Sequence, residues 1–85
     1  MEELKFDYSK VRGKIKEVFG TQDKFAENVN MGRVAVSQRL NNSIDLSDKE
    51  IFKWSRTLGI EAKDIPIYFF TLEVQKNEHK STITT

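Results

Sequence analysis

Four side chains that can contact nucleic-acid bases recur on one side of a short segment. They are Arg33, Val34, Ser37 and Gln38. Spacings of one, three and four residues place them on a common face if the segment is helical. Arginine and glutamine can form paired hydrogen bonds with base edges, valine can contact a thymine methyl group, and serine can bind a base or a phosphate. These residue types indicate a surface that reads double-stranded DNA.

The segment before these side chains has the features of a short helix followed by a tight turn. Thr21 is expected to cap that helix, because its hydroxyl can accept a first-turn N–H group that has no partner in the helix. Phe25, Ala26 and Val29 then form an apolar stripe, and the small Ala26 allows a second helix to cross closely. Asn30 follows where a left-handed backbone is expected, which asparagine tolerates best after glycine.

The second helix is predicted to bury one side and expose the other. Met31 would fill the corner of the turn, and Val36 and Leu40, four residues apart, would pack inward. The polar side chains named above would then face outward. Residues 21–42 are therefore predicted to form a helix-turn-helix, with an exposed second helix over residues 32–41.

Residues 21–42 resemble the helix-turn-helix of the phage-repressor family, the Cro/CI or XRE type. The matching positions are Gln22, Ala26, Asn30 in place of the usual glycine, Val36 and Asn41. Arg39 departs from the pattern, because many members bury an apolar residue at that position. With its flanking helices the resemblance covers roughly residues 8–65, and the chain is similar to the small Cro-like proteins of phages of Gram-positive bacteria.

The resemblance implies a fold and a set of DNA contacts. The fold would be all-α, a compact lambda-repressor-like bundle of four to five helices, with the second motif helix in the major groove. Arg33 would bind guanine, Val34 a thymine methyl group and Gln38 an adenine edge, while Ser37 would serve a base or a phosphate. The candidate phosphate contacts are Thr21, Gln22, Gly32, Asn41, Lys14 and Lys16.

The segment before the motif is predicted to be a helix that ends near Phe19, before Gly20. Asp7 or Ser9 would cap it. Tyr8, Val11, Ile15 and either Val18 or Phe19 would form its inner face. Its lysines admit two interpretations: a solvated helix face, or a phosphate contact by Lys14 or Lys16.

The segment after the motif carries the clearest helix start in the chain. Ser47 and Glu50 have the spacing of a capping box, and Leu46 and Ile51 that of a hydrophobic staple. Trp54 lies on the predicted inner stripe of this helix. We therefore assign Trp54 to the core in preference to a stacking platform for single-stranded bases.

The C-terminal part is more apolar than a surface tail requires. Residues 61–64 are expected to form one helical turn that ends at Ile65 and Pro66, because proline suits only the start of a helix, and residues 70–74 alternate as in a strand. That strand would pair with residues 4–6, giving a small terminal β-ribbon, or with its copy in a second subunit. The candidate dimer contacts are Phe69, Phe70, Leu72 and Val74, unless this stretch only completes the monomer core. Residues 1–74 would form the domain, and residues 75–85 a mobile polar tail.

Composition restricts the classes of function. The chain has 85 residues, a formal net charge of +1 and no cysteine, which fits one small domain in a reducing cytoplasm. No apolar run reaches the roughly 18 residues of a membrane span. His79, the single histidine, lies in the polar tail with no thiol and no carboxylate at ligand spacing with which to form a triad or a metal site. We therefore expect no enzyme activity, cofactor, metal, membrane association or small-molecule substrate.

Two functions of different classes remain. The first is a sequence-specific DNA-binding regulator, a phage-type repressor that binds a palindromic operator as a homodimer. The alternative is a protein-interaction module or antirepressor that keeps the helix-turn-helix fold, which the modest net charge and the apolar C-terminal stretch favour. An antitoxin role is also compatible with the residues.

Overall fold

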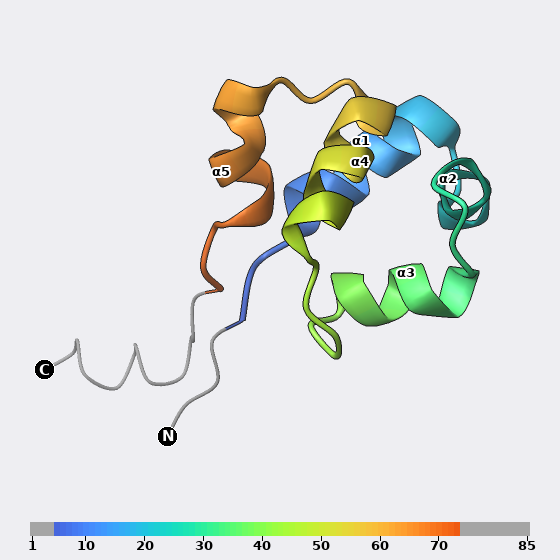
Figure 1. The fold of residues 1–85 in the computed structure, drawn as a ribbon, viewed down its shortest axis with the longest axis horizontal. Coiled ribbons are helices and arrows are strands. Elements are labelled where there is room, and N and C mark those ends of the chain that lie inside the picture. Colours follow the sequence, from blue (N-terminus) through green and yellow to red (C-terminus); the bar gives the residue numbers. More distant parts are fainter. Residues whose placement is uncertain (1–4, 74–85) are drawn as a thin grey trace, which may run out of the picture.

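The computed structural model describes residues 5–73 and shows a bundle of short helices (Figure 1). In chain order the elements are α1 (Ser9–Phe19), α2 (Gln22–Asn28), α3 (Arg33–Leu40), α4 (Asp48–Leu58), the 3-10 turn η1 (Ala62–Asp64) and α5 (Ile65–Phe69). In Figure 1, α1 and α4 occupy the middle, with α2 and α3 on one side and α5 on the other. The predicted all-α class is confirmed, and α3 is one residue shorter at each end than the predicted segment 32–41.

The hydrophobic core is centred on α4. Trp54 is fully buried, and its ring meets that of Phe25 edge to face with centroids 4.9 Å apart. Such aromatic pairs add to the stabilisation that burial alone provides. The other core side chains come from every α-helix and from the segments beside them: Tyr8, Val11, Ile15, Ala26, Val29, Val36, Leu40, Ile51, Leu58, Ile60 and Phe69. The assignment of Trp54 to the core is confirmed.

The start of α1 differs slightly from the prediction. The cap position is held by Tyr8, whose side chain makes no capping bond, so neither Asp7 nor Ser9 occupies it. Asp7 still serves the first turn, because its carboxylate accepts a hydrogen bond from the Ser9 N–H at 2.9 Å. Of the two inner-face alternatives, Phe19 packs against the core and Val18 is 46% exposed.

The boundaries of α4 follow the sequence closely. Ser47 accepts a hydrogen bond from the Glu50 N–H at 3.2 Å, and the Glu50 carboxylate accepts one from the Ser47 N–H at 3.0 Å. The predicted capping box is therefore present. The helix ends at Gly59, which has the left-handed backbone (φ 74°) that glycine adopts without steric cost.

The prediction that Pro66 breaks the helical pattern is wrong. Pro66 lies in the first turn of α5, where a missing N–H costs nothing because first-turn N–H groups have no partner within the helix. Ile65 has helical backbone angles (φ −53°, ψ −44°), although residues before a proline usually avoid them. The chain therefore passes directly from η1 into α5 and turns back toward α1.

The two ends of the described chain lie side by side. Phe6 and Leu72 form an isolated antiparallel bridge, flanked by hydrogen bonds from the Asp7 N–H to the Thr71 carbonyl (2.7 Å) and from the Glu73 N–H to the Lys5 carbonyl (3.0 Å). The C-terminal stretch thus pairs with its own N-terminal segment. Within residues 5–73 this bridge does not extend into a strand, so the β-ribbon is reduced to one contact.

Some predictions fall on residues that the structure does not describe. Leu4, Val74, His79 and the predicted tail 75–85 lie outside the described range. Within that range, no helix has both the length and the apolar character needed to cross a membrane.

Candidate functional site

The turn between α2 and α3 has the geometry that its sequence predicts. The Thr21 hydroxyl accepts a hydrogen bond from the Lys24 N–H at 3.2 Å and so caps α2. Asn30 is left-handed (φ 60°), and the Met31 N–H reaches back to the Ala26 carbonyl at 3.0 Å. Met31 is partly buried against the core. These contacts fix the sharp change of direction between the two helices.

The turn gives α3 one buried side and one exposed side. Val36 and Leu40 are almost fully buried, as predicted, whereas Val34 is 65% exposed. The exposed side meets the start of α2 in a hollow that we call the α3 hollow. It is lined by Gln22, Asp23, Arg33, Val34, Ser37 and Gln38. The structure therefore brings the four candidate base-reading residues together with Gln22, and their contact with DNA stays a prediction.

An acidic side chain also reaches the α3 hollow. Asp23, in the first turn of α2, has a carboxylate oxygen 3.5 Å from a guanidinium nitrogen of Arg33. The sequence has no acidic residue between Glu27 and Asp45, which taken alone indicates a locally positive exposed side of α3. The fold corrects this indication, because the turn folds α2 back against the start of α3. Both side chains are exposed, and their attraction is accordingly weak and screened by salt.

Arg39, which departs from the phage-repressor pattern, connects α3 to α4. Its Nε and Nη2 atoms each donate to a different oxygen of Glu50 at 3.1 Å, and its Nη1 atom donates to the Ala35 carbonyl at 2.9 Å. The hydrogen bonds from Arg39 hold the pKa of the Glu50 carboxyl below its ordinary value, against an opposing effect of burial. This contact fixes the rotation of α3, which places Leu40 inward and Arg33 outward.

The C-terminal end of α3 is held by the N-terminal part of the chain. Arg12 of α1 donates to the Leu40 carbonyl at 3.0 Å, which satisfies an otherwise free helix-end acceptor. Asn42 has a left-handed backbone (φ 67°), and its side-chain amide exchanges two hydrogen bonds with the backbone of Phe6, at 3.0 and 2.9 Å. Neither contact is predictable from the local sequence, because they join residues 28 and 36 positions apart.

The candidate phosphate-binding residues do not form one cluster. Gly32 is the exposed cap residue of α3, close to the α3 hollow. Asn41 caps the other end, where its side chain accepts a hydrogen bond from the Ser43 N–H at 2.9 Å. Lys14 pairs with Glu17 at 3.6 Å, and Lys16 is exposed on α1. Neither lysine lines the α3 hollow.

The candidate dimer residues have different environments. Phe69 is 1% exposed and packs in the monomer core, so it is not available to a second subunit. This corrects its assignment as a dimer contact. Phe70 and Leu72 are 48% and 53% exposed and stay candidates. Val74 lies beyond the described residues.

The described part of the chain offers little for metal chemistry. Among residues 5–73, no three histidine, cysteine, aspartate or glutamate side chains gather closely enough to hold a metal ion. The expectation that the protein is not an enzyme and needs no cofactor stays a prediction.

Comparisons with known proteins give a family and one informative relative. No curated protein matches the chain. Among solved structures, the solution structure of the modulator of repression (MOR) of the temperate bacteriophage TP901-1 from Lactococcus lactis matches with a TM-score of 0.71. The two sequences are 40% identical, and the match covers 82% of this chain and 95% of that chain.

Membership of the Cro/CI class itself stays a prediction. A family model matches residues 4–72, and the chain therefore belongs to DUF739, a protein family of unknown function.

Proposed function

We propose that this protein is a phage regulator that modulates repression by binding a repressor protein. The observation that carries the proposal is the likeness to the phage TP901-1 modulator of repression, at 40% identity over nearly the whole length of that chain. At this identity, and with a TM-score of 0.71, the two chains share a fold. A modulator of repression changes the activity of a repressor. The repressor protein is therefore the partner that we infer for this chain.

The charges on α3 support a protein partner over a DNA duplex. Arg33, the best candidate for reading a base, is paired with Asp23 at 3.5 Å. A carboxylate in the α3 hollow repels the phosphates that flank a major groove, and it lies beside the guanidinium group that would bind guanine. The formal net charge of +1 adds little attraction for a polyanion. A protein partner can bind a surface that carries both Arg33 and Asp23, because its interface can supply an acidic group for the arginine and a basic group for the aspartate.

Direct operator binding is the second candidate, and one observation favours it. Arg33, Val34, Ser37 and Gln38 share one exposed hollow at the start of α3, next to the N-terminal turn of α2. In this candidate, α3 enters the major groove of a palindromic operator, and a homodimer reads two half-sites about 34 Å apart. Phe70 and Leu72 are the exposed apolar residues that would meet in the dimer.

A gel-shift experiment with three components separates the two candidates. It uses this protein, the repressor of the phage or prophage that encodes it, and that repressor's operator. We expect the protein to change the mobility or the amount of the repressor–operator complex and to leave free operator unshifted at low salt. An unchanged repressor–operator complex would contradict the proposal. Selective binding by this protein alone, lost in Arg33→Ala, would establish the second candidate.

A further inference from the structure

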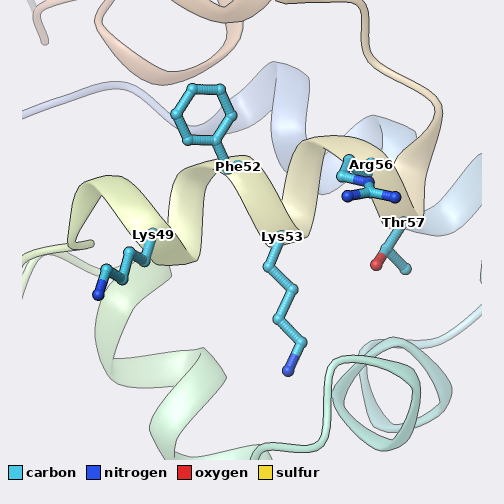
Figure 2. Close-up of a pocket in the computed structure, with 5 residues that line it drawn as sticks. All are labelled: Lys49, Phe52, Lys53, Arg56 and Thr57. Atoms are coloured by element: carbon cyan, nitrogen blue, oxygen red, sulfur yellow. The ribbon is translucent and has the colours of Figure 1, made fainter.

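The outer face of α4 carries an exposed aromatic side chain and three positively charged ones (Figure 2). Phe52 is 58% exposed. It lines an open hollow whose other residues all come from the same helix: Lys49, Lys53, Arg56 and Thr57. We call this surface the α4 face.

The α4 face is held rigidly from behind. Ile51, Trp54 and Leu58 lie on the opposite side of the helix and are buried in the core. The capping box fixes its first turn, and Gly59 ends it. In Figure 2, Phe52 points to one side of the helix and Lys49 and Lys53 to the other, while Arg56 lies toward the C-terminal end. A partner therefore meets a preformed helix backbone and orders only the side chains that it contacts.

The positive charges of the α4 face form no ion pair with another side chain of residues 5–73. None of the five lining residues is acidic. The ion pairs within residues 5–73 are Lys14–Glu17, Arg33–Asp23, Arg39–Glu50 and Lys63–Glu61. Lys49, Lys53 and Arg56 take part in none of them. By charge complementarity, the face suits a negatively charged group.

The exposed ring of Phe52 favours an acidic protein segment over duplex DNA as the negatively charged partner. Duplex DNA would use the cations as phosphate contacts but has no use for an aromatic side chain outside its grooves. A protein segment can use both features, because buried aromatic anchors surrounded by polar groups carry much of the binding energy in protein interfaces. A helix or loop with one apolar side chain flanked by aspartate or glutamate fits the α4 face.

We propose that the α4 face docks an acidic segment of the repressor, with an apolar side chain of that segment against Phe52. This inference rests on the proposed function, because it names the surface through which the repressor is bound. It assigns repressor binding to α4, and not to the α3 hollow.

The test measures the affinity of purified full-length variants for the repressor of the same phage or prophage, by calorimetry. Phe52→Ser removes the apolar anchor, and Lys53→Glu reverses one charge. The matched controls are Ile67→Ser on α5, which removes a side chain that is also half exposed, and Lys16→Glu on α1. All four positions are exposed, so the fold is retained, and circular dichroism checks this.

We expect Phe52→Ser and Lys53→Glu to weaken repressor binding about tenfold or more, and the controls to stay within about twofold of wild type. Wild-type binding should also weaken as salt is raised. If wild type binds and all four variants bind equally well, the repressor uses another surface and this inference is overturned, while the proposed function stands. If wild type does not bind the repressor, the proposed function fails. Loss of duplex DNA binding by Lys53→Glu, with repressor binding intact, would make the face a phosphate contact and overturn the inference.

Discussion

Asn42 stabilises the end of α3 through its backbone and its side chain. Its left-handed backbone (φ 67°) reverses the chain after the helix. Its side-chain amide binds both the N–H and the carbonyl of Phe6, and these bonds are partly buried. Because Phe6 also pairs with Leu72, Asn42 connects the helix-turn-helix to both ends of the described chain.

Two substitutions separate these contributions. We predict that Asn42→Gly, which keeps the left-handed backbone and loses the two hydrogen bonds, lowers the free energy of unfolding by about 1 to 2 kcal/mol. Asn42→Ala also places an ordinary side chain in a left-handed backbone and should cost roughly 1 kcal/mol more. Urea denaturation of both variants measures the difference. Equal stability of the two variants would show that the backbone conformation carries no cost.

A single substitution at Asp23 tests direct DNA binding. Asp23→Asn removes the carboxylate 3.5 Å from Arg33 while keeping the size of the side chain. If α3 reads DNA, this change should raise affinity for duplex DNA several-fold, because a repulsive charge is lost and Arg33 becomes free. Fluorescence anisotropy with an operator duplex measures this effect. Unchanged weak affinity in Asp23→Asn, as in wild type, is the result that the repressor-binding proposal predicts.

At the scale of elements, the pair of Arg39 and Glu50 sets how α3 lies against α4. The fork of two 3.1 Å hydrogen bonds is partly shielded, with side-chain exposures of 16% for Arg39 and 26% for Glu50. Glu50 also completes the capping box of α4. One carboxylate therefore begins α4 and orients α3, which makes it a sensitive point of the fold.

Because the pKa of Glu50 is lowered in the folded protein, its contribution to the free energy of unfolding depends on pH. A carboxyl whose pKa is lower in the folded state stabilises the fold above its unfolded pKa, and this stabilisation is lost as pH falls through the folded pKa. We predict that Glu50→Gln lowers the free energy of unfolding by about 1 to 2 kcal/mol at pH 7 and by progressively less below about pH 4.5. Urea denaturation between pH 7 and pH 3 tests this. Glu17→Gln, at a carboxylate that is 69% exposed, is the control and should change little. A deficit in Glu50→Gln that does not vary with pH would contradict this account.

At the scale of the whole molecule, the sequence predicted local features better than contacts between distant segments. The cap at Thr21, the left-handed Asn30 and the capping box of α4 each depend on residues within a few positions, and all are present. The pairs of Arg33 with Asp23 and Arg39 with Glu50 join residues 10 and 11 positions apart, across turns whose angle the sequence does not specify. Pro66 misled the prediction because proline disfavours a helix interior but suits a first turn.

The C-terminal stretch completes the monomer core and leaves Ile67, Phe70 and Leu72 exposed. We predict that Phe69→Ala lowers the free energy of unfolding by about 3 to 5 kcal/mol, because Phe69 is almost fully buried. Phe70→Ala, at a side chain that is 48% exposed, should cost about 1 kcal/mol or less. Thermal and urea denaturation measure both. A small effect of Phe69→Ala would mean that α5 is not part of the cooperative core.

The oligomeric state is a separate prediction at this scale. If Phe70 and Leu72 form a dimer contact, Phe70→Ser combined with Leu72→Ser should convert a dimer to a monomer in sedimentation velocity experiments, with the helical content retained. A wild-type protein that sediments as a monomer both alone and with operator DNA would contradict the dimer.

The central claim is that this protein modulates repression by binding a repressor. Its most direct test is isothermal titration calorimetry of wild-type protein with the purified repressor of the phage or prophage that encodes it. We predict saturable binding with a Kd of about 1 μM or tighter, as expected for a specific protein interface. No detectable binding at protein concentrations well above that value would contradict the claim.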